Sequence, residues 1–282
     1  MGLLGSIHPC DSRIRSCWSA RNWHSEKMEA SQTISLTHCQ PEGHREILDQ
    51  VAVEEPLEIR LDGHPVAVVM RTPGHDEELA AGFLVTEGII SKVTELRKIE
   101  ARPDENRVLV FLQDGVEVDL GRLTRHLFTG SSCGLCGKAT LAAIFTDFPP
   151  IARGIEISEA VLLEAPAKLR AAQGTFETTG GLHAAGIFSA AGELLIIRED
   201  IGRHNAVDKV IGHALLSGID LTATFLLVSG RLSFEIMQKA LAARIPTVAA
   251  ISAPSSLAVE FAKTSGQTLI GFLRPPTFNR YA

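Results

Sequence analysis

The sequence lacks any long apolar run. None of its hydrophobic stretches approaches the roughly 18 residues that a membrane-spanning helix needs, so we expect a soluble protein with no membrane partner. An excess of positive charge is also missing, because 27 Lys and Arg residues face 33 Asp and Glu residues, for a formal net charge of -6. Nucleic-acid-binding proteins normally present a basic face, so this balance argues against broad nucleic-acid binding. The negative net charge does not exclude a local basic pocket that binds a phosphorylated ligand.

Cysteine is scarce and unevenly spread. The chain has five cysteines, an odd number, and three of them lie in the N-terminal stretch: Cys10, Cys17 and Cys39. A secreted disulfide framework usually has an even set, so this pattern favours a reducing compartment. The sequence also lacks the apolar core of a signal peptide. We therefore expect the protein to work in the cytoplasm.

The first 45 residues show no clear hydrophobic period. They are polar and rich in Ser and His. A stretch without a repeating apolar face is typical of a loop or tail. We predict that residues 1–45 form a flexible N-terminal extension.

Strand-like alternation then defines a first folded unit, residues 46–128. Residues 57–61 and 66–70 alternate as strands do, and Asp62-Gly63 lies between them. Asp-Gly supplies the positive φ angles that a tight two-residue turn demands, so the two segments are predicted to form a hairpin.

The rest of this unit is predicted to contain a helix and a second hairpin. Thr72-Pro73 is expected to open the helix and Gly88 to end it. Residues 107–113 and 116–120 form a second alternating pair, again joined by Asp-Gly. The unit is therefore predicted to be a small, β-rich α+β subdomain.

The remainder, residues 129–282, alternates short apolar runs with helical stretches of about ten residues. The expected strands of its last third are 223–228, 247–251 and 268–273. Short apolar strands separated by helices indicate a parallel sheet with right-handed crossovers. We predict an α/β domain, and the sequence contains no internal repeat.

A glycine-rich loop at residues 128–138 carries the pair Cys133 and Cys136. A Cys-x-x-Cys pair places two thiols close together, and nearby amide N–H groups and Lys138 favour the thiolate. A thiolate is the nucleophile that takes sulfur from a persulfide, and the second thiol can help to release it. Two other uses stay open. One is half of a zinc site, although no second Cys-x-x-Cys exists, and the other is a thioredoxin-type dithiol, although the usual aromatic neighbours are lacking.

Polar residues cluster where the last strands end. Arg203 and His204 follow Gly202 at the start of a predicted helix, a position that suits a phosphate or a ribose. Arg231 and residues 252–256 follow parallel strands, at the edge where open α/β sheets bind ligands. We expect Arg203, His204, Arg231 and Arg274 to gather along that edge.

Each of these signals also has a structural explanation. A charged helix start is often a solvated cap, and we expect Arg203, His204 and Asp208 to share a face of that helix other than its buried face. His183 precedes an expected strand, and a lone histidine is more often structural than functional. Zinc deaminases carry His-x-Glu upstream of their cysteines. Here Ala185 stands where that glutamate would be and the cysteines come first, so we expect no deamination and assign no metal site.

Taken together and in order, the motifs from about residue 45 to the end resemble the FdhD/NarQ family, the formate dehydrogenase accessory sulfurtransferases. The matching segments are Arg71-Thr-Pro-Gly, Glu77-Glu-Leu-Ala-Ala-Gly-Phe-Leu, Thr86-Glu-Gly88, Cys133-Gly-Leu-Cys136-Gly, Thr179-Gly-Gly-Leu-His183, Glu199-Asp-Ile-Gly-Arg-His-Asn-Ala-Val-Asp-Lys209, Ser229-Gly-Arg231 and Gly271-Phe-Leu-Arg274.

The resemblance implies a cytidine-deaminase-like three-layer α/β fold and a homodimer. It also implies that a cysteine desulfurase loads Cys133 with a persulfide, with Cys136 as the accompanying thiol. The sulfur then passes to the bis(molybdopterin guanine dinucleotide) molybdenum cofactor before that cargo enters the catalytic subunit of formate dehydrogenase. The family's cofactor-binding segment corresponds to Phe272, Leu273, Arg274, Pro275, Pro276 and Thr277, and we add Arg203, His204, Arg231 and His183 to the site.

Two rival functions are a zinc-dependent nucleotide-modifying enzyme and a non-catalytic cofactor chaperone whose cysteines only contact a partner. Metal analysis distinguishes the first from a sulfurtransferase, and persulfide labelling distinguishes the second.

Overall fold

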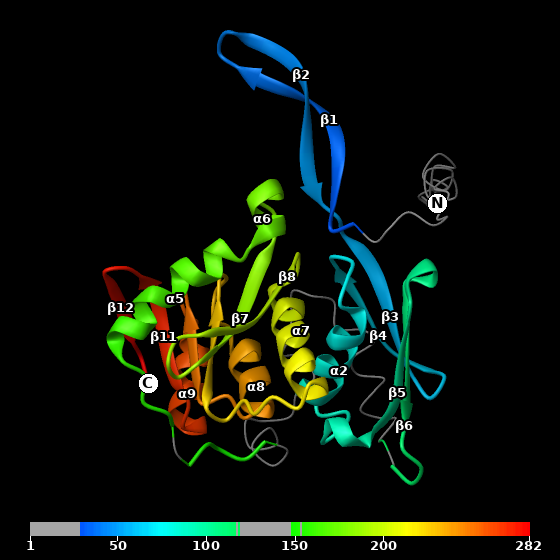
Figure 1. Ribbon diagram of the computed structural model, residues 1–282, viewed down its shortest axis with the longest axis vertical. Coiled ribbons are helices and arrows are strands. Elements are labelled where there is room, and N and C mark those ends of the chain that lie inside the picture. The colour runs from blue at the N-terminus through cyan, green and yellow to red at the C-terminus, as the bar shows by residue number, and fades with distance from the viewer. Residues whose placement is uncertain (1–28, 117, 119–147, 153) are drawn as a thin grey trace, which may run out of the picture.

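The computed structural model describes residues 29–116, 118, 148–152 and 154–282. Within these ranges the chain forms three sheets (Figure 1). They have two, four and six strands, in the orders β1-β2, β4-β3-β6-β5 and β12-β11-β10-β9-β7-β8. The protein is thus a mixed α/β structure, as the strand and helix patterns predicted.

The six-stranded sheet is built from the C-terminal part of the chain. Its strands are β7 (His183–Ser189), β8 (Leu194–Asp200), β9 (Thr224–Val228), β10 (Thr247–Ala250), β11 (Thr268–Arg274) and β12 (Thr277–Arg280). β9, β10 and β11 are parallel, which confirms the prediction made from their short apolar runs. β7 is antiparallel to both β8 and β9, and β12 returns antiparallel to β11.

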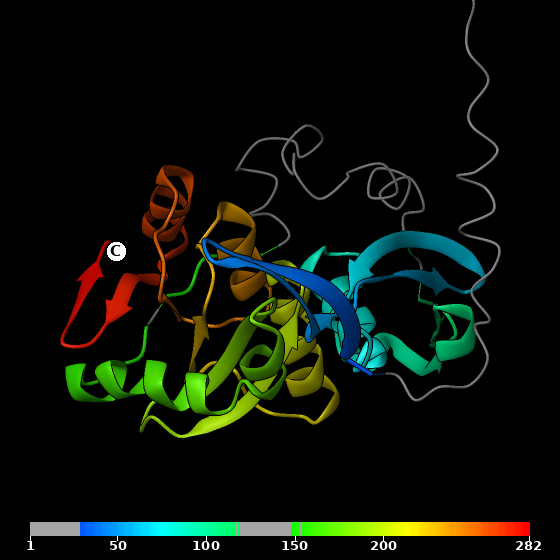
Figure 2. The ribbon, with the colours of Figure 1, turned by 90° about the horizontal axis from the view of Figure 1, so that it is seen from above.

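Helices cover both faces of this sheet and give three layers. The helices are α5 (Glu159–Ala171), α6 (Gly174–Thr179), α7 (Arg203–Leu216), α8 (Phe234–Ala242) and α9 (Ser256–Ser265). One core cluster joins α7, α8 and α9 to one face of the strands, and a second joins α5 to the other face. Figure 2 shows α5 and α9 on opposite sides of the strands. Because successive strand residues point to opposite faces, a strand between two helical layers is buried on both faces and mostly apolar, as β9 is, with Thr224 as its one polar residue.

The four-stranded sheet packs on one helix and forms the smaller β-rich unit. Its elements are β3 (Glu55–Leu61), β4 (His64–Arg71), α2 (Asp76–Thr86), the short 3-10 turns η1 (Val93–Glu95) and η2 (Pro103–Glu105), β5 (Leu96–Arg102) and β6 (Arg107–Leu112). A third core cluster lies between α2 and these strands. The predicted hairpin of β3 and β4 is confirmed, with Asp62 at φ 45° and Gly63 at φ 83° in its turn.

Two local predictions for this unit were wrong. β6 pairs with β5 and β3, whereas Val116 and Val118 lie outside any strand. The other residues of the strand that we expected over 116–120 lie outside the described ranges. The helix begins at Asp76 and not at Thr72, because the backbone takes a positive φ of 101° at Gly74 and 59° at His75.

The prediction of a tail over residues 1–45 was also wrong from residue 31 onward. β1 (Ser31–Gln40) and β2 (Gly43–Ala52) pair along their full length as an antiparallel hairpin that projects from the body (Figure 1). We call this hairpin the arm. Ile34 and Leu36 alternate with polar residues in β1, but β2 places Ile47 next to Leu48, so the sequence shows no clear strand period. Residues 1–28, Cys133 and Cys136 lie outside the described residues.

Candidate functional site

The predicted binding loops meet at one edge of the six-stranded sheet. β9, β10 and β11 are parallel, so their carboxyl ends lie at the same edge. β7 runs in the opposite direction, and its first residue, His183, pairs with Asp200 at the end of β8. The loops after β9 and β10 and the start of α7 therefore converge there (Figure 1). We call this place the carboxyl edge.

Backbone hydrogen bonds continue past the strand ends and fix these loops. The Ser229 amide donates to the Ala184 carbonyl at 2.9 Å, and the Ser229 hydroxyl accepts from the Ala184 amide at 2.9 Å. Leu232 donates to the Ala253 carbonyl at 3.1 Å and accepts from the Ser255 amide at 2.8 Å. The loop after β9 is thus tied to β7 on one side and to the loop after β10 on the other.

Four of the predicted cofactor-binding residues come together at the carboxyl edge: His183, Arg203, His204 and Arg231. A side chain added at Gly230 would begin 3.3 Å from His183 Nδ1 and 3.6 Å from Arg203 Cβ, so glycine leaves the space between them open. The charges of Arg203, His204 and Arg231 all act on His183. We call these four residues the cationic cluster.

Two members of the cluster differ in their contacts: His204 has partners on α8, whereas one N–H group of Arg203 has none among the described residues. His204 Nε2 lies 2.8 Å from Glu235 Oε2 and 3.3 Å from Ser233 Oγ, at the start of α8. Arg203 Nε is buried and has no hydrogen-bond partner among the described residues. Buried polar groups are nearly always hydrogen-bonded, and a guanidinium N–H pairs most strongly with an anion. The arrangement therefore suits an anionic ligand beside Arg203.

Burial and the neighbouring residues of the cluster together set the charge of His183. Burial, and then the charges of Arg203, His204 and Arg231, lower the pKa of His183 below its usual value of 6.5, while Asp200 acts in the opposite sense. His183 is therefore a neutral imidazole near pH 7. Two arginines and a neutral imidazole make a local basic patch on a protein whose net charge is negative.

Most other charges of the segment 198–209 are structural. Glu199 accepts from the Thr175 amide at 2.9 Å and so holds the start of α6. Asp200 is fully buried; it lies 2.7 Å from Lys209 Nζ and accepts from the Thr72 amide at 3.2 Å. These bonds join the turn before α2 to the turn before α7. They fix the helix start from which Arg203 projects.

The prediction that Asp208 shares a face other than the buried one with Arg203 and His204 was wrong. Asp208 is only 2% exposed and accepts from Lys239 Nζ at 2.9 Å and from the Thr86 hydroxyl at 2.7 Å. Although burial opposes it, the carboxylates of Asp208 and Glu87 raise the pKa of the Lys239 ammonium. Asp208 thus belongs to a buried ion pair between α7 and α8.

The segment 272–277 comprises the end of β11, the turn Pro275-Pro276 and the start of β12, so one further strand follows it. Arg274 Nε donates to the Ile251 carbonyl at 2.9 Å, and the Arg274 guanidinium lies 5.6 Å from the ring centre of Phe272. Pro275, Pro276 and Thr277 are exposed. Leu273 is fully buried in the core, so its side chain packs within the protein and does not face a ligand.

Arg274 lies on the carboxyl edge but apart from the cationic cluster. β10 and β9 separate its strand, β11, from β7, which carries His183. A ligand that contacts both Arg274 and the cationic cluster must therefore extend across several strands of the sheet.

A cavity of about 310 Å³ lies next to the site. It is lined by residues of the turn before α2, of α6, of β8 and of the base of the arm, among them Gly74, Thr175, Arg198 and Lys209. No member of the cationic cluster lines it. The cavity and the cluster are linked through the pair Lys209–Asp200.

Two features of this site could not be predicted from the sequence. Glu235, which anchors His204, lies on α8, and only the packing of α8 against α7 brings the two together. Asp200 could have been taken for a surface charge, because its partner Lys209 is nine residues further on and across a turn. Neither contact follows from local spacing.

The described residues add two further observations. They contain no group of three or more His, Cys, Asp or Glu side chains that is suited to hold a metal ion. No helix within them has both the length and the apolar character needed to cross a bilayer.

The sequence closely matches known proteins. A model of the FdhD/NarQ family matches residues 52–282. The sulfur carrier protein FdhD of Streptomyces avermitilis is 51% identical over 250 residues, which cover 83% of this chain and 87% of that protein. The sulfur carrier protein FdhD of Sulfolobus acidocaldarius is 44% identical over 234 residues, with 83% of this chain and 89% of that protein covered.

A solved structure is also similar. It is the crystal structure of a "putative formate dehydrogenase accessory protein" from Desulfotalea psychrophila, with a TM-score of 0.74 and 28% sequence identity. The match covers 90% of this chain and 97% of that one. Since 90% of the chain is more than residues 52–282, the structural match reaches into the arm, which the family model leaves out.

Proposed function

Because the chain belongs to the FdhD/NarQ family, we propose that it is a sulfur carrier protein that serves the maturation of formate dehydrogenase. The observation that carries the proposal is the family match over residues 52–282, which includes Cys133 and Cys136. The protein then acts as a sulfurtransferase, and a cysteine desulfurase supplies the sulfur.

The proposed chemistry uses the two cysteines in turn. The Cys133 thiolate attacks the outer sulfur of the desulfurase persulfide, the S–S bond of that persulfide breaks, and the desulfurase thiolate leaves. Cys133 then carries the extra sulfur. When the Cys136 thiolate attacks the Cys133 sulfur, a disulfide forms and the carried sulfur leaves to the acceptor. A cellular dithiol reductant must then reduce the disulfide before the next cycle.

The proposed acceptor is the bis(molybdopterin guanine dinucleotide) molybdenum cofactor, bound as cargo. This cargo carries several phosphates, so its site needs cations and free amide donors. The cationic cluster supports this assignment, since Arg203 has a buried N–H without a partner. The hairpin 272–277 adds a further cation, Arg274, at the end of β11, which β10 and β9 separate from β7.

The proposal also covers the fold, the oligomeric state and the location of the protein. We propose a cytidine-deaminase-like fold for the six-stranded sheet and its helices, supported by the mixed sheet between two helical layers. We also propose that two copies form a homodimer in the cytoplasm. The catalytic subunit of formate dehydrogenase then receives the sulfurated cargo.

The test follows a single sulfur atom. After incubation with a cysteine desulfurase and cysteine, the intact protein is expected to gain the mass of one sulfur, and Cys133→Ala is expected to abolish both this gain and formate dehydrogenase maturation. Cys39→Ala is the matched control, because Cys39 is a free, exposed cysteine on the arm, and it should behave like the wild type. Normal maturation with Cys133→Ala would show that the sulfur relay does not use this loop.

A further inference from the structure

The cavity of about 310 Å³ lies at the seam between the two larger sheets. One of its walls is the turn that leads from β4 into α2, and another is β8, the outer strand of the six-stranded sheet. Figure 1 shows both elements close to the base of the arm. Pockets of this size bind small ligands, and they are common where two structural units meet. Because no member of the cationic cluster lines the cavity, the proposed cargo site does not account for it.

The β8 side of the cavity offers backbone groups that no strand pairs. Among the described strands, only β7 pairs with β8. Ala184 of β7 lies opposite Glu199, and both the N–H and the C=O of Ala184 bond to Ser229, on the side of β9. In an antiparallel pair of this kind, the opposite residue also points its N–H and C=O away from the partner strand. Glu199, and Ile197 two residues earlier, therefore direct these groups to the open edge, and both residues line the cavity.

The charged side chains that line the cavity already have partners within the protein. Lys209 Nζ lies 2.7 Å from Asp200 Oδ2. The Arg198 guanidinium donates to both carboxylate oxygens of Glu78, at 2.6 and 2.8 Å. The Glu199 carboxylate accepts from two amides at the start of α6, at 2.9 and 2.8 Å. Since a charged ligand would have to displace one of these contacts, the cavity favours an uncharged polar ligand.

The remaining lining supplies one further donor and small apolar walls. The Lys209 ammonium has three N–H groups, and Asp200 and the Thr72 carbonyl, at 2.9 Å, account for two of them. The third can donate to a carbonyl oxygen of a ligand. The apolar residues of the lining are Ala30, Pro73, Ala172 and Leu182. They leave room for a small apolar side chain.

We propose that the cavity binds an extended, uncharged peptide segment with a small apolar side chain, which adds to the open edge of β8. A peptide backbone is neutral and presents an N–H and a C=O on the same side at every second residue, which matches Ile197 and Glu199. About three residues span these two positions. The third N–H of Lys209 then pairs with a peptide carbonyl.

The segment belongs to the protein that receives the cargo, which in the proposed function is the catalytic subunit of formate dehydrogenase. Leu182 lines the cavity and directly precedes His183 of the cationic cluster. Asp200, which pairs with the buried lysine of the cavity, also accepts from the Gly202 amide at 2.8 Å, at the start of α7. A segment in the cavity therefore lies beside the proposed cargo, where the receiving protein has to be. The inference deepens the proposed function, and its choice of partner rests on that function.

A peptide tests the site in the full chain. Acetyl-Ala-Val-Ala-amide is uncharged, and in an NMR titration it should shift the amide resonances of Ile197 and Glu199. Ala172→Trp fills the cavity from its exposed rim and should weaken the peptide affinity at least tenfold. Ala171→Trp is the matched control, because Ala171 is the neighbouring exposed alanine and does not line the cavity, so it should bind like the wild type. A peptide that shifts neither amide, or sodium acetate that binds as tightly as the peptide, would overturn the inference.

Hydrogen exchange tests the partner without any substitution. Adding the catalytic subunit of formate dehydrogenase, free of cargo, should slow exchange of the Ile197 and Glu199 amides at least tenfold, and the peptide should compete. Protection of these amides by a cysteine desulfurase, or protection in the chain alone that dilution removes, would give the edge another occupant and overturn the inference. The sulfur gain at Cys133 is measured separately. Its absence would remove the proposed function, whereas failure of the two amides to respond would remove only the peptide site.

Discussion

His183 shows how single residues set the charge of the candidate site. Its imidazole lies close to Arg203, His204 and Arg231, and burial together with these neighbours lowers its pKa below 6.5. The folded protein therefore binds this proton less readily than the unfolded chain. Between the lowered pKa and 6.5 the unfolded state binds more protons, so this residue's contribution to stability is present above 6.5 and is lost as the pH falls through that window.

We expect the titration midpoint of the His183 imidazole to depend on the charges of the cationic cluster. In an NMR titration of the imidazole, the midpoint should lie below 6.5 in the wild type and should rise in Arg231→Gln, because one neighbouring cation is removed. An anion bound in the cluster should also raise it. Arg97→Gln, in β5 of the other sheet, is the control and should leave the midpoint unchanged. A midpoint that Arg231→Gln does not move would mean that the two side chains are not electrostatically coupled.

At the scale of elements, the two sheets are joined where α2 crosses α7. Gly82 and Gly212 lie at the crossing, and a Cβ on Gly212 would begin 1.8 Å from the Glu78 carbonyl oxygen. A Cβ on Gly82 would begin 1.9 Å from the Asp208 carbonyl oxygen. Because both neighbours are helix backbone, neither can move aside without separating the helices. Glycine at both positions therefore allows this close packing.

Gly212→Ala should consequently destabilise the protein. Overpacking of a tight contact costs about 1–3 kcal/mol or more, and α7 also carries Arg203 and His204, so ligand binding should weaken as well. Urea unfolding monitored by circular dichroism measures the loss. Gly174→Ala is the matched control, because no atom lies within 4 Å of a Cβ at that position. Equal stability of the two variants would show that the helices can separate at little cost.

The elements of the fold differ in whether the sequence alone could predict them. The strands β9, β10 and β11 and the hairpin of β3 and β4 were predictable, because apolar runs and an Asp-Gly turn are local signals. β5 was missed because its segment, Leu96–Arg102, carries four charged residues and few inward apolar positions. The burial of Asp208 was missed because its partner Lys239 is 31 residues away. Contacts of this kind depend on how the elements pack and not on local pattern.

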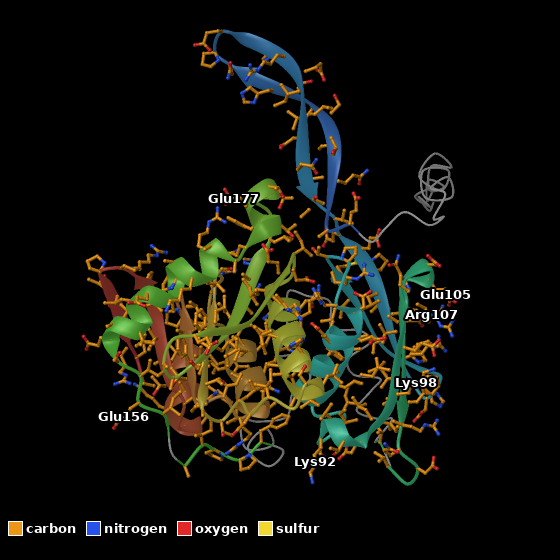
Figure 3. The ribbon with its side chains drawn as sticks, viewed as in Figure 1. Lys92, Lys98, Glu105, Arg107, Glu156 and Glu177 are labelled. Carbon is orange, nitrogen blue, oxygen red and sulfur yellow. The ribbon has the colours of Figure 1, made fainter. Side chains whose placement is uncertain are left out.

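At the scale of the whole molecule, the charges are distributed unevenly. The chain has a net charge of -6, yet Arg203, Arg231 and Arg274 lie along the carboxyl edge. On the outer face of the four-stranded sheet, by contrast, cations pair with acids: Arg107 lies 2.7 Å from Glu58, and Figure 3 shows Arg107 next to Glu105. A phosphorylated ligand is therefore attracted to the carboxyl edge and not to the other sheet.

This charge distribution predicts that the same substitution has different effects on ligand affinity at two exposed arginines that both lie on strands. Arg274→Glu places a carboxylate where phosphate is proposed to bind. It should therefore weaken the affinity for GDP, a guanine nucleotide that stands in for part of the proposed cargo, at least tenfold, about 1.4 kcal/mol. Arg97→Glu, on β5, makes the same change to a side chain that is 54% exposed and should do little. Calorimetric titration at two salt concentrations measures both. Because salt shortens the range of charge interactions from about 10 Å at 0.1 M to about 3 Å at 1 M, the effect of Arg274→Glu should shrink as salt rises. Equal affinities for the two variants would remove the hairpin 272–277 from the binding site and leave the cationic cluster as its only basic part among the residues described.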